Sequence, residues 1–398
     1  MYKRQNLPQP PAVPAAELQE AIGRMVGDGL ARRVAVDHPL QPFDPRNFLP
    51  DAVMAGVVWS FDASAAAGAR ALIGPPRPQP QFLSRPLPPL GDAAIDLAAL
   101  VRFVEHPVRE FLRARFGLRL HGVGDEPSDG MPLELAALDK WAVGDRMLRA
   151  ARRERDLDEW AASEAVRGVL PPGALGTSVL EEISPHVIEL AAEAAIWQGD
   201  RSSGSVGIDL AIGAGRRIVG TVHRVHDELL VSCGYSRLGP KPRLQAWVRL
   251  LALTAMDPDH GYRSVVIGRD PHAAQPTAAV AAIEPLEPGV ARRALSRLVA
   301  LYDAGMCTVP MIFTRTSAAY ANGLLAAATP RRGTGHLKRE WERGFGAPVP
   351  GESEDPSHVL VLGAQLDFDQ LWSRHGDALR TSALALWEDL IAAEGRSA

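Results

Sequence analysis

The stretch VGIDLAIGAGRRIVGTVHRVHDELLVSCGYSRLGPKPRLQAWVRLLAL, residues 206–253, carries most of the information about the fold. Residues 206–212 and 217–225 are rich in strand-forming residues and are joined by a glycine-containing turn. A third run of this kind begins at residue 229, after a short polar turn. Because both turns are too short to hold a crossover helix, the pattern predicts a meander of three antiparallel strands.

A helix is expected directly after these strands. Within residues 243–255, Leu244, Trp247 and Leu251 are spaced so that they form one apolar helix face. Strands and helices thus alternate in one stretch of chain. We therefore predict the fold class α/β (α+β).

Helical patterns also precede the strands. Apolar residues recur at helical spacing from Ile95 onward, Asp96 can cap the start of that helix, and Pro107 suits the first position of a second one. Further helices are expected over residues 133–151, 157–169 and 183–197, with a turn signal PPGALG at residues 171–176. A proline-rich run, residues 75–90, predicts an extended linker.

Composition limits the function classes. The chain has 398 residues, 46% of them hydrophobic and 23% charged, which is enough apolar surface for more than one globular domain. Its net charge of −4 gives no global attraction to nucleic acid, so any such binding must come from local basic patches. The two cysteines form no CxxC pattern, and we find neither a signal peptide nor a membrane-spanning run. We expect a cytoplasmic protein without membrane contact.

The layout of residues 206–253 resembles the PD-(D/E)xK nuclease fold. In that fold a Gly-x-(Ile/Val)-Asp strand precedes an (Asp/Glu)-x-Lys strand and a helix that begins with Gln, and the carboxylates bind magnesium. Here His223 stands in place of the Asp, and Ser232 and Gly234 stand where the second acid and the Lys are expected. Gln245 alone is retained. We therefore predict a degenerate site with no catalytic residue.

Other motifs give less support for a catalytic or metal-binding site. His223 and His226 form an HxxH pair, but on a strand they would face opposite sides, which favours structural roles. The residues of the DPDHG segment, 257–261, are typical of a turn, with metal binding as the alternative. The sequence has no phosphate-binding loop of the GxxxxGK(S/T) type and no GxSxG motif, so we expect neither ATP binding nor a serine hydrolase.

Two basic segments favour a solvated surface, with DNA contact as the alternative in both. The first is a helix face that carries Arg102, Arg109 and Arg113. The second, residues 331–346, mixes basic and aromatic side chains, a combination that suits single-stranded nucleic acid. Its candidate DNA-binding residues are Arg331, Arg332, Lys338 and Arg339.

Seven motifs in order resemble the C-terminal part of RecC, the gamma subunit of the bacterial RecBCD helicase-nuclease (exodeoxyribonuclease V). They are HPLQPFDPRNF (38–48), IDLAALVRFVEHPVREFLRARFGLRL (95–120), LPPGALG (170–176), VGTVHRV (219–225), YSRLGPKPRLQAWVRLLAL (235–253), LVALYDAGMCTVPMIFTRTSAAYA (298–321) and GESEDP (351–356). RecC subunits are longer, so the resemblance implies a C-terminal fragment. The domains that scan for the Chi sequence would lie outside it.

The resemblance implies three regions and a set of partners. Residues 1–50 would be a disordered start and the end of a helicase-like domain, residues 51–94 a proline-rich linker, and residues 95–398 the nuclease-like domain. The partners would be RecB-like and RecD-like subunits, double-stranded DNA ends and single-stranded DNA, in double-strand break repair by homologous recombination. Magnesium and ATP are expected only in the partner subunits, and this chain would hold no cofactor.

Two alternatives to a non-catalytic, DNA-guiding scaffold stay open on the sequence. One is an active magnesium-dependent nuclease with unusual ligands, such as Asp209 with Asp227 or Glu228. The other is a protein-interaction module without DNA contact.

Overall fold

A computed structural model describes residues 12–27, 29–30, 34, 36–74, 81–120, 134–213, 215–326, 333–343, 349–364 and 366–395. The chain divides into two compact units, Met1–Pro80 and Gln81–Ala398. The elements of the first unit are α1 (Val13–Val26), the 3-10 helix η1 (Pro45–Phe48) and α3 (Ala63–Ile73).

The second unit holds the sheet and the remaining helices. Its strands are β1 (Ala94–Asp96), β2 (Gly204–Gly213), β3 (Arg216–His226), β4 (Leu229–Arg237), β5 (Arg263–Arg269) and β6 (Ala278–Ile283). Its helices are α4 (Leu97–Glu105), α5 (Pro107–Phe116), α6 (Ala137–Ala151), α7 (Leu157–Val166), α8 (Ala174–Gln198), α9 (Pro240–Met256), α10 (Pro288–Cys307), α11 (Thr314–Ala321), η2 (Asn322–Ala326), α12 (Gly335–Glu342), η3 (Glu352–Glu354), α13 (Pro356–Leu362) and α14 (Phe368–Glu394).

The first unit contains a compact turn built around Asn47. The Asn47 amide is buried and donates to the backbone carbonyls of Gln41 and Pro42 at 3.0 and 3.1 Å. Asp44 caps η1 by accepting a hydrogen bond from the backbone N–H of Arg46 at 3.0 Å. Within the HPLQPFDPRNF motif, the buried Asn47 amide therefore has hydrogen-bond partners, as a buried polar group requires.

The predicted meander is confirmed. β2 pairs antiparallel with β3, with Asp209 opposite Val219, and β3 pairs antiparallel with β4 at Val225 and Leu230. The turn between β3 and β4 places Asp227 at a positive φ of 53°, a conformation that Asp adopts more readily than most residues. α9 follows and begins slightly earlier than predicted, because prolines in its first turn fit the start of a helix.

The sheet is mixed, which confirms the α/β (α+β) class. In the described residues it has six strands in the order β1-β3-β4-β5-β6, with β2 also paired to β3. β4 and β5 are parallel and are joined by α9, as a parallel connection requires a crossover. β1 is parallel to β3, and β6 pairs antiparallel with β5.

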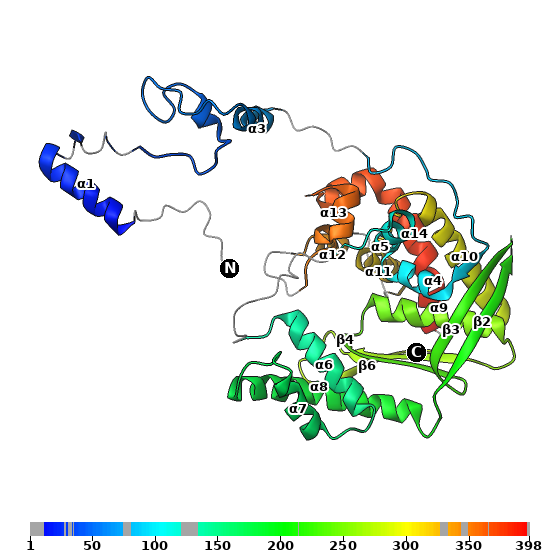
Figure 1. Cartoon of the computed structure of the whole chain (residues 1–398). Coiled ribbons are helices and arrows are strands. Elements are labelled where there is room, and N and C mark those ends of the chain that lie inside the picture. The colour runs from blue at the N-terminus through cyan, green and yellow to red at the C-terminus, as the bar shows by residue number, and fades with distance from the viewer. Residues whose placement is uncertain are drawn as a thin grey trace. The chain divides into compact units, whose positions relative to one another are not determined.

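Helices cover both faces of the sheet (Figure 1). On β4, Leu230 belongs to the core that includes Trp247 of α9, whereas Leu229 and Val231 belong to the core that includes Ile183 of α8. Successive strand side chains point to opposite faces, so one strand supplies both cores. The sheet is therefore buried between α4, α9 and α10 on one side and α6 and α8 on the other.

The predicted starts of α4 and α5 are confirmed. The Asp96 side chain accepts from the backbone N–H of Ala98 at 3.1 Å and caps α4. α5 begins at Pro107, where the missing N–H would have no helical partner in any case. Both helices bury an apolar face that includes Phe103 and Phe111.

The segment expected to be a linker, residues 51–94, differs from a free spacer in the structure. It contains α3, and its last part belongs to the second unit. Phe82 packs edge-on against Phe111, with ring centroids 6.4 Å apart, and the Leu87 N–H donates to the Cys307 carbonyl at 2.7 Å. Apolar residues between the prolines give this extended chain something to bury, which proline content alone does not reveal.

The helix predicted over residues 183–197 is longer than expected. α8 begins at Ala174, inside the predicted turn segment of residues 171–176, because Gly173 already serves as the N-cap of the helix. Pro185 lies inside α8, where the burial of Ile183 and Val187 offsets the lost helical hydrogen bond. None of the helices formed by the described residues is both long enough and apolar enough to cross a membrane.

Candidate functional site

Two of the four positions that the sequence comparison aligned with nuclease ligands line one cavity. His223 on β3 and Ser232 on β4 both contribute to a cavity of about 720 Å³. Gly234 does not line this cavity, and Gln245 on α9 instead donates a hydrogen bond to the carboxylate of Glu105. The structure thus brings His223 and Ser232 together and leaves Gly234 and Gln245 outside the cavity.

The cavity lies between α4, β3, β4 and α9. Its lining residues are Leu97, Ala98, Val101, Arg102, Glu105, Thr221, His223, Arg224, Leu230, Val231, Ser232 and Arg249. Three guanidinium groups therefore face one carboxylate, accompanied by hydroxyls and an imidazole. This set is basic, whereas a magnesium nuclease needs an acidic one.

The ligand set does not fit magnesium. Glu105 is the single acid that lines the cavity, and burial raises its pKa although Lys241 and Arg249 partly oppose that shift. Mg²⁺ is held by carboxylate oxygens, and guanidinium groups beside it would repel it. We derive no metal-dependent step for this cavity.

The alternative nuclease ligands are not brought together. Asp209 pairs with Arg217 on the neighbouring strand, and this bond lowers the pKa of the exposed Asp209 carboxyl. Asp209 lies opposite Val219, whereas Asp227 and Glu228 follow the far end of β3. With a rise of about 3.3 Å per residue, eight strand residues separate the two places by roughly 26 Å. They cannot share a metal ion.

Arg224 reaches the cavity through a β-bulge. Ser205 pairs with His223 and Gly204 pairs with Val225, so Arg224 is an extra residue without a partner on β2. Its φ of 61° is left-handed, which costs a non-glycine residue roughly 1–2 kcal/mol. In a regular strand, Arg224 would lie on the other face of the sheet from its neighbour His223, yet both residues line the same cavity. The sequence pattern could not show this, because it assumes unbroken alternation.

Arg249 is the second cation that sequence reasoning missed. It lies on α9, one turn after Gln245, and that spacing places both on one helix face. Burial lowers the pKa of Arg249, the charge of Glu105 opposes that shift, and the charge of Arg224 adds to it. We find no hydrogen bond or ion pair from Arg249 to any residue in the described part of the chain.

The first predicted DNA-binding face is largely occupied by ion pairs. Glu110 is 2% exposed and accepts hydrogen bonds from Arg102 Nε at 3.2 Å and from Arg113 Nε at 2.7 Å. Arg109 contacts Asp355 at 3.1 Å. Arg102 also lines the cavity, so it is the member of this group closest to the degenerate positions.

The described part of the second predicted DNA-binding segment, residues 333–343, includes α12. Lys338 contacts Asp369 at 2.7 Å, and this hydrogen bond raises the pKa of Lys338. Arg339 is exposed. Arg331 and Arg332 lie outside the described residues.

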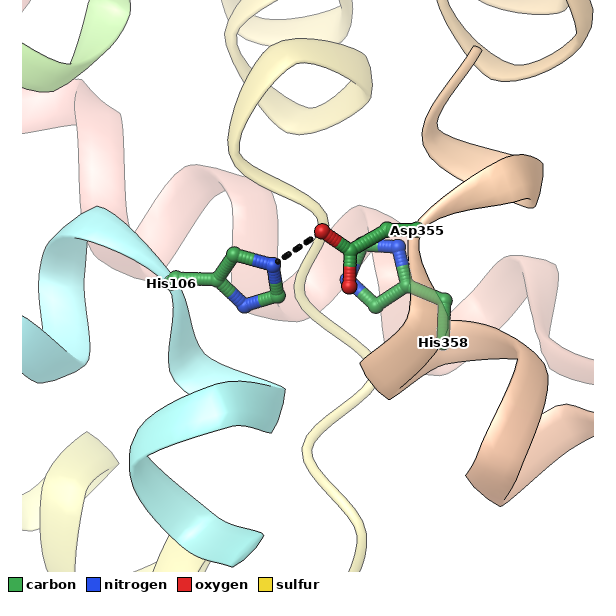
Figure 2. Close-up of side chains that lie close together, drawn as sticks. All are labelled: His106, Asp355 and His358. Atoms are coloured by element: carbon green, nitrogen blue, oxygen red, sulfur yellow. Dashed lines mark hydrogen bonds and ion pairs between the residues drawn. The ribbon is translucent and has the colours of Figure 1, made fainter. Parts of the chain in front are cut away.

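A second polar cluster joins the start of α5 to the start of α13 (Figure 2). His106, Asp355 and His358 offer ligand atoms that all lie within 4.8 Å of one another, which makes them a candidate metal centre. His106 Nε2 lies 3.0 Å from Asp355 Oδ2. No other group of three such residues is found in the described ranges, so His226 and the loop with Asp257 form no such centre.

The hydrogen bonds of the cluster favour a structural junction over a metal centre. His106 Nδ1 accepts from the backbone N–H of Arg109 at 3.2 Å, so we assign the ring proton to Nε2, which donates to Asp355. A metal ion at Nε2 would displace that proton beside the Arg109 guanidinium. Both Asp355 oxygens are already used, since Oδ1 caps α13 through the Ser357 N–H at 2.8 Å.

The pKa values in the cluster follow from burial and these bonds. Burial alone would raise the pKa of Asp355, but the hydrogen bond and charge of His106 hold it well below its usual range. Burial lowers the pKa of His358 to about 4, with a smaller contribution from His106. His358 Nδ1 lies 2.6 Å from the Glu352 carbonyl and donates to it.

The GESEDP motif has a structural role in this junction. The buried Glu352 carboxylate accepts from the backbone N–H groups of Arg315 at 2.9 Å and Thr316 at 2.8 Å, at the start of α11. A Cβ on Gly351 would lie 2.4 Å from the Trp341 carbonyl, so only glycine fits there. The motif thus ties α11, α12 and α13 together.

Fold and site together define a mixed α/β protein with a cation-lined cavity at its sheet and no magnesium-type ligand set among the residues described. A family model, the RecC C-terminal domain, matches residues 92–325. The chain belongs to this family.

Three relatives show the extent of the similarity. The chain is 35% identical to the RecBCD enzyme subunit RecC of Mycobacterium tuberculosis (strain ATCC 25618 / H37Rv), over 99% of this chain and 36% of that protein. It is 37% identical to the RecBCD enzyme subunit RecC of Mycolicibacterium smegmatis, over 89% of this chain and 32% of that protein. It is 25% identical to the RecBCD enzyme subunit RecC of Escherichia coli K12, over 71% of this chain and 23% of that protein. The chain thus spans about a third of the length of its mycobacterial relatives.

Proposed function

We propose that this chain is the non-catalytic C-terminal region of a RecC-type subunit of a DNA helicase and exonuclease complex that acts in double-strand break repair by homologous recombination. In this role it holds RecB-like and RecD-like subunits and guides DNA strands. Magnesium and ATP then belong to the partner subunits. The proposal assigns residues 1–50 to the end of a helicase-like domain, residues 51–94 to the connection, and residues 95–398 to the nuclease-like domain.

The cavity carries the proposal. The succession of α8, the β2–β4 meander, α9 and a β5 strand parallel to β4 supports a degenerate PD-(D/E)xK core. At its centre His223 and Ser232 stand where that fold has acidic ligands, and three arginines face a single Glu105. A core that keeps its layout without its ligands suits a domain retained for shape and binding.

Exposed apolar side chains support contact with a partner protein. On α8, Ile188 is 57% exposed and Ile196 is 75% exposed, although large aliphatic side chains are usually buried. Two such side chains on one helix can contribute to a protein interface. This observation also favours the alternative function, a protein-interaction module without DNA contact.

We expect the chain to co-purify with the RecB-like subunit from the same source. Affinity capture of the tagged chain and quantification of the bound RecB-like subunit checks this. The variant Ile188→Ser/Ile196→Ser should fold, because both side chains are exposed, and should capture less partner if α8 contributes to the interface. Absence of capture by the native chain counts against the scaffold role.

A further inference from the structure

The cavity holds more positive charge than its own residues neutralise. Arg102 shares the carboxylate of Glu110, but Arg224 and Arg249 make no ion pair with any residue that the structure describes. Glu105, the single acid in the lining, accepts a hydrogen bond from Gln245. Two guanidinium groups in one cavity repel each other unless an anion lies between them.

The backbone places one of these cations in the cavity despite strain. Arg224 has a left-handed φ of 61° at the bulge and lines the same cavity as His223. Strained residues of this kind persist at binding sites, where the surrounding structure holds them. Arg224 is exposed, so a ligand can reach it from solvent.

The cavity lining also includes neutral polar groups. Ser205 Oγ lies 2.8 Å from His223 Nδ1 and leaves Nε2 without a partner in the described chain. The hydroxyls of Thr221 and Ser232 also line the cavity. Guanidinium groups bind the paired oxygens of a phosphate in a bidentate manner, and neutral donors complete such a site.

We propose that this cavity binds a phosphodiester group of DNA through Arg224 and Arg249, without a metal ion and without cleavage. The inference rests on the proposed DNA-guiding function and gives it a location. The former nuclease cavity has thereby become a holding site, in which fixed cations take the place of magnesium against the phosphate charge.

The test measures binding of the full chain to a fluorescent 20-nucleotide single strand and to the corresponding duplex, in EDTA, by anisotropy over a range of salt concentrations. Arg224→Gly removes the cation and relieves the left-handed strain, and Arg249→Met removes the unpaired charge at similar length. Each should weaken binding about tenfold, the effect of losing one charged hydrogen bond. Each should also lower the salt slope by about 0.7 (single strand) to 0.9 (duplex).

Controls separate the cavity from general charge. Arg293→Gln removes an exposed cation on α10 and should leave affinity unchanged, and Arg224→Lys keeps the charge, so it should preserve the salt slope while losing the bidentate contact. Arg224→Gly should unfold at the same or higher urea concentration, because glycine accepts this φ, so weaker binding cannot come from unfolding. The strand type that loses more affinity identifies the bound DNA form, and excess inorganic phosphate should compete.

Three results overturn the proposal: no DNA binding by the native chain, unchanged affinity in both cavity variants, or an equal loss in Arg293→Gln. DNA binding that is insensitive to the cavity variants would remove the cavity site and leave the proposed function in place. Cavity-dependent DNA binding without capture of a RecB-like subunit would support the cavity site and count against the scaffold role.

Discussion

Replacing Glu110 by Ala is expected to destabilise the second unit by about 1–3 kcal/mol, the cost of losing charged hydrogen bonds when the arginine partners are themselves partly exposed. The Glu110 carboxylate is 2% exposed and accepts hydrogen bonds from Arg102 and from both Nε and Nη2 of Arg113. Its loss leaves Arg113 beside an apolar helix interface without a counterion, whereas Arg102 keeps its contact with Asp96 at 3.6 Å. Urea unfolding followed by circular dichroism measures the effect.

A matched exposed pair provides the control. Asp377 pairs with Arg380 three residues later on α14 and is 95% exposed. Asp377→Ala should change the unfolding free energy by less than about 0.5 kcal/mol, since exposed pairs contribute little. If Glu110→Ala costs no more than this control, Glu110 is not a buried counterion. DNA-binding tests at Arg102 or Arg113 need the same unfolding measurement, because their loss also disturbs Glu110.

Acidification is expected to destabilise the protein through His358. Its pKa is about 4 in the folded chain against 6.5 when unfolded, because burial disfavours the charged ring. The unfolded chain therefore takes up a proton first, and the stability present above pH 6.5 is lost as the pH falls toward 4. Linkage gives a loss of about 2 kcal/mol between pH 7 and pH 5.

His358→Asn isolates this contribution. Asn can still donate to the Glu352 carbonyl but does not titrate, so the groups that face this ring, His106, Asp355 and Glu352, stay in place. Unfolding free energies at pH 7 and pH 5 should differ by about 2 kcal/mol less in the variant than in the native chain. Identical pH dependence in both would show that His358 is not the responsible group.

Local sequence patterns predicted much of the second unit. The meander, the Asp96 cap and the Pro107 helix start depend on residues close together in the chain, where propensity and turn chemistry act directly. His223 and Ser232 could also be named from the sequence as non-acidic positions, because this depends on residue identity alone. Two of the four positions named from the sequence, His223 and Ser232, line the cavity, but the cavity itself was not predicted.

What escaped prediction depends on tertiary packing. The bulge that directs Arg224 breaks the alternation on which strand patterns depend. His106 and Asp355 meet across 249 residues of chain, and no local pattern pairs them. Likewise, the basic face of α4 and α5 looked free for DNA, because the burial of Glu110 beneath Arg102 and Arg113 is visible only in the folded chain.

The claim that this chain no longer cuts DNA has a direct test. The full chain is incubated with end-labelled linear duplex and single-stranded DNA in the presence of Mg²⁺ or Mn²⁺, and the products are resolved by size. The account predicts intact DNA under every condition, because Glu105 is the single carboxylate that lines the cavity. Metal-dependent cleavage that disappears in Glu105→Gln would contradict it.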